Sequence, residues 1–126
     1  MTRPRITGLD HVQLAMPPGA EEEARRFYVG VLGLDEEEKP EPMRSRGGAW
    51  FRGPATVVHL GVEQDFRAAR KAHPAFLVED LEACRAALEA AGCETVDADG
   101  PARRFHAFDP FGNRLEFVAD GEGFSQ

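Results

Sequence analysis

Cysteine and long apolar runs are scarce in this sequence, and each scarcity excludes a class of protein. Only two of the 126 residues are cysteines, Cys84 and Cys93, and they form no CxxC pair. We therefore expect no disulfide framework, but two small buried or half-buried thiols in a reducing compartment. No apolar run reaches the ~18 residues of a membrane span, and MTRPRITGLD lacks a signal-peptide core. These features predict a cytoplasmic protein that does not enter the membrane.

An excess of positive charge is also missing. The chain has 15 Lys and Arg residues against 22 Asp and Glu residues, a net charge of −7, and no long basic run. A nucleic-acid partner calls for a basic face, so we expect none. The length favours a single domain over residues 1–126, and an apolar content of 42% allows it a core of its own.

The first half of the chain alternates between strand and helix patterns. GLDHVQLAM predicts a strand, and AEEEARRFYVGVLG predicts an amphipathic helix with Gly33 as its C-terminal cap. DEEEKPEP fits a short edge strand or a loop. GGAWFRG and ATVVHLGV predict two more strands, and the polar segment Glu63–Ala72 predicts a linker or one turn of helix.

The second half repeats this order. HPAFLV predicts a strand, EDLEACRAALEAAG a helix with Asp80 as N-cap and Gly92 as C-terminal cap, and CETVDA a short strand. ARRFHAFD and NRLEFVA predict a closing hairpin around DPFGN. The fold class is therefore α+β, with two tandem βαβββ modules forming a curved mixed sheet. Module 1 covers about residues 6–62 and module 2 about residues 73–119.

Ligand-type side chains fall at matching places in the two modules. His11 and His73 stand at the first strands, and His59 and Glu116 stand on the last strands, 48 and 43 residues further on. If the modules pair about a pseudo-twofold axis, these four residues converge. Imidazoles with one carboxylate are a typical site for a divalent transition metal such as Fe, Mn, Ni, Zn or Co.

Each of these residues also has a plainer interpretation. A histidine at a strand start is often a surface residue, and His59 fits a core histidine with one hydrogen bond. A buried carboxylate between Leu115 and Phe117 is costly unless it is paired or ligated, and Arg114 on the same face is a possible partner for Glu116.

Four segments of the chain resemble the vicinal oxygen chelate superfamily of glyoxalases, bleomycin resistance proteins and extradiol dioxygenases. They are LDHVQL, EEARRFYVGVLGL, AHPAFLVEDLEACRAALEAAG and RRFHAFDPFGNRLEF. The last contains DPxGNxxEF, a signature of this group, and together the segments span about residues 8–119.

The resemblance implies paired modules that form a cup around one divalent metal, with ligands from the first and last strands. His11, His73 and Glu116 match ligand positions shared by many members, and His59 matches a position that is Glu in glyoxalase I. That difference argues against lactoylglutathione lyase activity. Small members generally form homodimers, so a site within one chain and a site between two chains are both open.

His106 is a candidate acid or base, together with Glu116 as a catalytic group. If the turn centres on Phe111, His106 lies opposite Glu116 and shares its face. In ring-cleaving relatives a tyrosine often stands there, and an imidazole titrates near neutrality. A turn centre shifted by one residue would point His106 away. Gln13, Trp50, Arg52 and Arg114 are candidate substrate contacts, although Trp50 also fits a core or interface position.

Three functions follow. The first is a metal-dependent isomerase, lyase or dioxygenase that binds two neighbouring oxygens of a small molecule and stabilises an oxyanion or enolate. The second is a metal-free protein that sequesters a small molecule, as bleomycin-binding relatives do. The third, ranked lower because no potassium-loop signature is present, is a thiol or water transferase of the fosfomycin-resistance kind.

Overall fold

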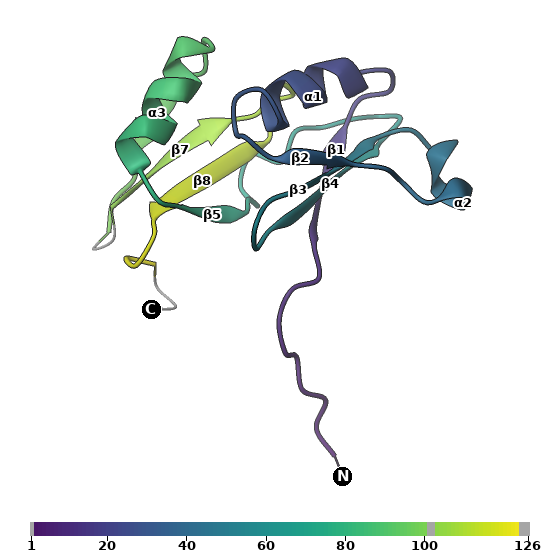
Figure 1. The fold of residues 1–126 in the computed structure, drawn as a ribbon, viewed down its shortest axis with the longest axis horizontal. Coiled ribbons are helices and arrows are strands. Elements are labelled where there is room, and N and C mark those ends of the chain that lie inside the picture. Colours follow the sequence, from purple (N-terminus) through teal and green to yellow (C-terminus); the bar gives the residue numbers. More distant parts are fainter. Residues whose placement is uncertain (1, 101–102, 124–126) are drawn as a thin grey trace.

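The computed structural model describes residues 2–100 and 103–123 as two βαβββ units joined by a long loop (Figure 1). Module 1 contains β1 (Val12–Met16), α1 (Glu21–Tyr28), β2 (Asp35–Glu37), α2 (Glu41–Arg44), β3 (Ala49–Arg52) and β4 (Val57–Val62). Module 2 contains β5 (Ala75–Val78), α3 (Leu81–Ala90), β6 (Thr95–Asp97), β7 (Arg104–Phe108) and β8 (Arg114–Ala119). The predicted α+β class and the repeated element order are confirmed.

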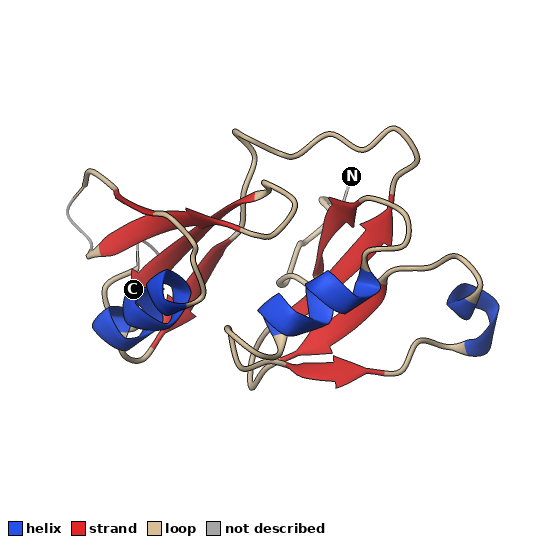
Figure 2. Ribbon diagram, turned by 90° about the horizontal axis from the view of Figure 1, so that it is seen from above, coloured by secondary structure: helices blue, strands red, loops and turns tan. Residues whose placement is uncertain are grey.

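Each module forms its own four-stranded mixed sheet. The strand orders are β1-β4-β3-β2 and β5-β8-β7-β6, with the first strand parallel to the last and the other pairs antiparallel. Figure 2 shows the two sheets as separate units connected by the loop between β4 and β5. Within the described ranges no strand pair joins them. The predicted curved sheet is therefore divided into two halves in this chain.

Two segments of module 1 differ from the sequence prediction. Helix α1 ends at Tyr28, although the apolar stripe continues to Val31 and Leu32. The amides of Val31 and Leu32 both donate to the carbonyl of Phe27, so the chain tightens into a turn that still packs both side chains against the core. The DEEEKPEP segment forms the edge strand β2 and then a loop, and the single-turn helix α2 after Pro40 was not predicted.

Other local predictions are confirmed. The linker segment has no regular structure. The Asp80 carboxylate caps α3 by accepting a hydrogen bond from the Ala83 amide at 3.0 Å. Cys84 and Cys93 are half-buried and unpaired, and burial raises the pKa of the Cys84 thiol to about 11. No helix in residues 2–100 and 103–123 has the length and hydropathy that crossing a membrane requires.

The helices cover one face of each sheet and leave the other face for polar residues. In module 1, Tyr28 of α1 stacks on Phe51 of β3, with ring centroids 5.3 Å apart. In module 2, Phe105 stacks on Phe117 at the same separation, and Leu88 of α3 is fully buried. Full burial of such a side chain contributes about 1.5–3 kcal/mol to folding. Because strand residues alternate, the opposite faces carry the histidines.

A buried polar cluster ties the turn of the β7–β8 hairpin to module 1. The Tyr28 hydroxyl donates to Asp109 Oδ2 at 2.8 Å. Asn113 Nδ2 donates to the Ala15 carbonyl at 2.8 Å, and its Oδ1 accepts from the Ala69 amide at 3.0 Å. The DPFGN turn of module 2 is thus connected to module 1 by hydrogen bonds.

Candidate metal site

His73 lies just before β5 and points across the sheet toward Glu116 of β8. Its Nε2 is 2.9 Å from Glu116 Oε1, and its Nδ1 is 2.8 Å from the Lys71 carbonyl oxygen. The carbonyl oxygen accepts only, so Nδ1 carries a proton. In a neutral ring Nε2 would then present a lone pair to a carboxylate oxygen, and such a contact is favourable only with a proton or a cation between the two atoms.

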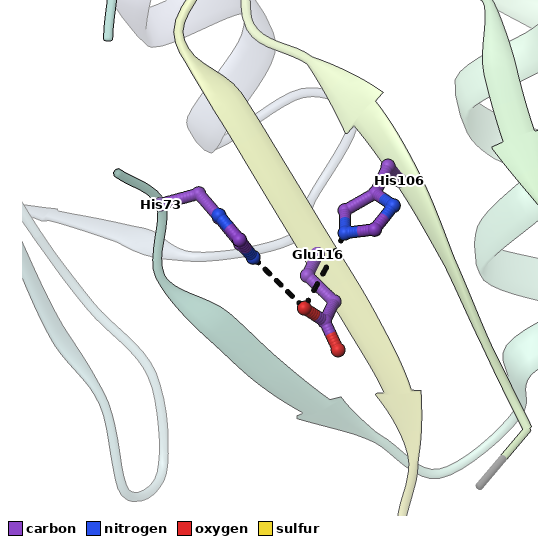
Figure 3. A group of neighbouring side chains, drawn as sticks. All are labelled: His73, His106 and Glu116. Atoms are coloured by element: carbon purple, nitrogen blue, oxygen red, sulfur yellow. Dashed lines mark hydrogen bonds and ion pairs between the residues drawn. The ribbon is translucent and has the colours of Figure 1, made fainter. Parts of the chain in front are cut away.

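His106 of β7 is directly opposite Glu116 in the hairpin register. The prediction that the turn centres on Phe111 is therefore confirmed. His106 Nε2 lies 3.4 Å from Glu116 Oε1, so the two imidazoles approach the same carboxylate oxygen from opposite sides (Figure 3). One ligand atom each from His73, His106 and Glu116 all lie within 4.8 Å of one another.

Two guanidinium groups flank this cluster. Arg104 Nη1 is 3.1 Å from Glu116 Oε2. Arg114 Nη2 lies 3.2 Å and 3.4 Å from the two ring nitrogens of His106. The prediction that Arg114 pairs with Glu116 was wrong, because Arg114 contacts His106 instead. The carboxylate pairs with Arg104, which lies two residues before His106 on the same face.

The electrostatics keep Glu116 ionised and His106 neutral. Burial opposes the charge on Glu116, but the contacts with His73 and Arg104 outweigh it and hold its pKa below the ordinary value. Burial, followed by the charge of Arg114, lowers the pKa of His106. An ionised carboxylate and a neutral imidazole are the protonation states that bind a metal ion. The donor set therefore fits a divalent transition metal, with His73, His106 and Glu116 as its ligands.

The other two histidines lie in module 1 and stack on each other. The ring centroids of His11 and His59 are 4.1 Å apart, and Trp50 stacks on the other side of His59 at 3.9 Å. Burial and the neighbouring His11 lower the pKa of His59. Neither histidine belongs to the ligand group found in the described part of the chain. The structure thus separates the four predicted ligands into two pairs.

His11 and His73 nevertheless face one common space. A groove of about 1000 Å³ runs between the edge strands β1 and β5, and both histidines line it, with Asn113 between the modules. A second hollow of about 550 Å³ lies over the module 1 sheet and is lined by three of the predicted substrate contacts, Gln13, Trp50 and Arg52. Arg52 is held there by Glu37 at 2.7 Å. The fourth, Arg114, lies in module 2 beside His106.

The sequence prediction missed the roles that the structure indicates for His106 and Arg104. His106 was expected as an acid or base, and the structure places it in the group of three side chains that could hold a metal ion. Arg104 was not predicted to contact Glu116. The period-two alternation of β7 carries the signal for both, since Arg104, His106 and Phe108 share one face.

The structure combines two repeated βαβββ modules with a group of two histidines and one carboxylate that could hold a metal ion. The family model of the glyoxalase/bleomycin resistance protein/dioxygenase superfamily matches residues 8–117. The chain belongs to this superfamily.

Solved structures agree with that assignment. A protein from Bacillus anthracis assigned to the glyoxalase family is 46% identical, with a TM-score of 0.88 over 94% of this chain and 98% of that chain. An integron cassette protein from the Halifax Harbour sewage outfall is 26% identical, with a TM-score of 0.71 over 90% and 99%.

The fosfomycin resistance protein FosX from Listeria monocytogenes, solved with Mn(II) and sulfate, shares the fold at 16% identity. Its TM-score is 0.73 over 91% of each chain. No match is found among curated proteins.

Proposed function

We propose that this protein is a divalent-metal-dependent enzyme acting on a small molecule with two neighbouring oxygens. The observation that carries the proposal is the convergence of His73, His106 and Glu116 within 4.8 Å. One ion of Fe, Mn, Ni, Zn or Co would bind there. It would polarise the substrate oxygens and favour an oxyanion or enolate.

The residues around the ion have distinct tasks in this proposal. One carboxylate and two neutral imidazoles leave a divalent site with net positive charge, which suits an anionic intermediate. The indole of Trp50 and the guanidinium of Arg52 on the module 1 face suit a planar or carboxylated substrate. Gln13 and Arg114 supply further polar contacts to it. If the ion is held without His106, this residue is instead the candidate base, because burial lowers its pKa and leaves the ring unprotonated.

We also propose that the protein works as a homodimer. Among the described residues, no strand pairs with the outer sides of the edge strands β1 and β5, and each strand borders the groove that His11 and His73 line. A second copy would cover these edges. It would also place His11 of the partner subunit near His73 and Glu116.

The test is metal binding by wild-type protein and by Glu116→Gln. Protein purified without chelator is analysed for metals, and the metal-free form is titrated with Mn²⁺, Co²⁺, Ni²⁺ and Zn²⁺. We expect near-stoichiometric binding by the wild type. Loss of a charged ligand should weaken metal affinity by more than the ~10–100-fold that is typical when a residue hydrogen-bonded to a ligand is changed. Glu94→Gln, a change at an exposed carboxylate, is the matched control and should bind as wild type.

His106→Gln separates the two roles of that residue. A ligand role predicts a clear loss of metal affinity, whereas a base role predicts retained affinity with lost turnover. A wild-type protein that binds none of the four ions would refute the enzyme proposal.

One observation favours a second candidate, a metal-free protein that sequesters a small molecule. Each buried side-chain nitrogen and oxygen of the described residues has a hydrogen-bond partner, so the Glu116 cluster is satisfied without an ion. Metal-free protein that gains thermal stability with an aromatic ligand, and binds no metal, would support this candidate.

A further inference from the structure

We propose that Arg104 is a positioning residue that occupies one oxygen of Glu116 and so restricts this carboxylate to a single metal–oxygen bond. The inference rests on the proposed metal site. Its consequence is that the ion keeps room for both oxygens of a chelating substrate.

The two oxygens of Glu116 have separate environments. Oε1 faces the imidazoles, 2.9 Å from His73 Nε2 and 3.4 Å from His106 Nε2. Oε2 faces away from them and lies 3.1 Å from Arg104 Nη1. Only Oε1 is therefore presented to the space between the two histidines. Figure 3 shows this division, with both dashed contacts ending on the same oxygen.

Arg104 is itself held in place. Its Nε donates to the Asp99 carbonyl oxygen at 3.0 Å, and its Nη2 donates to the same carbonyl oxygen. Its side chain is only 18% exposed. The loop packs closely on the guanidinium, since a Cβ at Gly100 would lie 2.8 Å from Arg104 Nη2. A guanidinium anchored on a backbone carbonyl does not swing aside as a surface lysine would.

The chemistry follows from the ways a carboxylate binds metals. Carboxylates bind divalent ions through one oxygen or through both. A charge-assisted bond from Arg104 to Oε2 would have to be given up before that oxygen could turn toward the ion. Arg104 thus favours the one-oxygen mode. This leaves an additional coordination position, and a ligand with two neighbouring oxygens requires two such positions.

The experiment uses Co²⁺-loaded full-length protein and acetohydroxamate, a bidentate oxygen ligand, as the probe. Arg104→Gln is compared with wild type and with Arg103→Gln. Arg103 is an adjacent, exposed arginine paired with Glu82 and Glu122, and it serves as the matched control. Co²⁺ affinity, the visible Co²⁺ absorption spectrum and acetohydroxamate affinity are measured for each, with thermal unfolding as the check of the fold.

A change at a residue that only contacts a metal ligand typically weakens metal binding. We expect Arg104→Gln to differ and to bind Co²⁺ at least as tightly as wild type, because the second oxygen of Glu116 is then free to bind the ion. Its Co²⁺ spectrum should change, and its acetohydroxamate affinity should fall, because one coordination position fewer is open to the probe. Arg103→Gln should match wild type in all three measurements. Gly100→Ala, which crowds the guanidinium without removing it and also strains the backbone at φ +124°, should shift the spectrum and the acetohydroxamate affinity in the same direction as Arg104→Gln, provided that thermal unfolding shows it to be folded.

Two outcomes would overturn the inference. One is unchanged acetohydroxamate affinity and spectrum in folded Arg104→Gln and Gly100→Ala proteins. The other is loss of Co²⁺ binding in those variants, which would make Arg104 a support for Glu116 and nothing more. Failure of the wild type to bind Co²⁺ or another ion is a different result, and it rejects the metal site itself.

Discussion

The buried carboxylate of Asp109 accepts four hydrogen bonds. It is 4% exposed, and one oxygen accepts hydrogen bonds from the amides of Phe111 and Asn113. The other accepts from the Tyr28 hydroxyl and from Asn113 Nδ2. These bonds link the hairpin turn to α1. Burial is nevertheless the dominant influence and raises the pKa of Asp109, with the hydrogen bonds offsetting it only in part.

This raised pKa predicts a pH dependence of stability. The folded state holds a proton on Asp109 more tightly than the unfolded chain does. The contribution is complete below the unfolded value of 3.8 and is lost as pH rises through the folded pKa. We expect the free energy of unfolding of wild type, relative to Asp109→Asn, to decrease as pH rises above about 4, measured by urea unfolding. Asp65→Asn, in an exposed loop, is the control. A difference that increases with pH would show that the hydrogen bonds dominate.

At the scale of elements, the β7–β8 hairpin carries most of the site. Its register places His106 opposite Glu116 and puts Arg104 on the same face. The equivalent hairpin of module 1 pairs Trp50 with His59. The repeated architecture therefore supplies two related polar faces, one with ligand atoms and one with an aromatic stack.

Glycines at the strand ends allow a further prediction about elements. Gly48 precedes β3 with φ +86°, and a Cβ there would lie 2.1 Å from the Leu60 carbonyl oxygen of β4. Gly19 has φ +78° and open space around it. Both Gly→Ala changes carry the backbone cost of roughly 1–2 kcal/mol for a left-handed residue. Gly48→Ala must in addition separate β3 from β4, so we expect it to lower the unfolding midpoint clearly more than Gly19→Ala. Equal losses in thermal unfolding would contradict the close approach.

At the scale of the whole molecule, the question is where His11 acts. Its ring stacks on His59 in module 1, across the groove from His73. If His11 also binds the ion, as the resemblance implies, it does so either from the same chain as His73 or from a second copy of the chain. Mixing variants distinguishes these arrangements, because exchange between subunits can restore a site that neither variant has alone.

We expect His11→Ala and Glu116→Gln each to bind metal poorly. After subunit exchange, their mixture should recover about a quarter of the wild-type metal content. Half of the dimers in a random mixture contain one subunit of each variant, and each such dimer has one intact site out of two. Metal content is measured on the dimer fraction after size-exclusion chromatography. A mixture that recovers nothing, or a monomeric wild type, would place the site within a single chain. Mixtures of His11→Ala with itself provide the baseline.

The sequence alone determined the two modules, the superfamily and the element order apart from β2 and α2, because strand alternation, the helix stripe and the DPFGN turn are all local patterns. It left two hairpin registers open, and the structure selects the one in which His106 opposes Glu116. Tertiary structure decided which side chains meet across elements. Arg104 takes Oε2 of Glu116, His106 joins His73 around Oε1, and His11 stacks on His59. Those contacts depend on sheet twist, side-chain rotamers and the packing of one module against the other, and no local pattern encodes them.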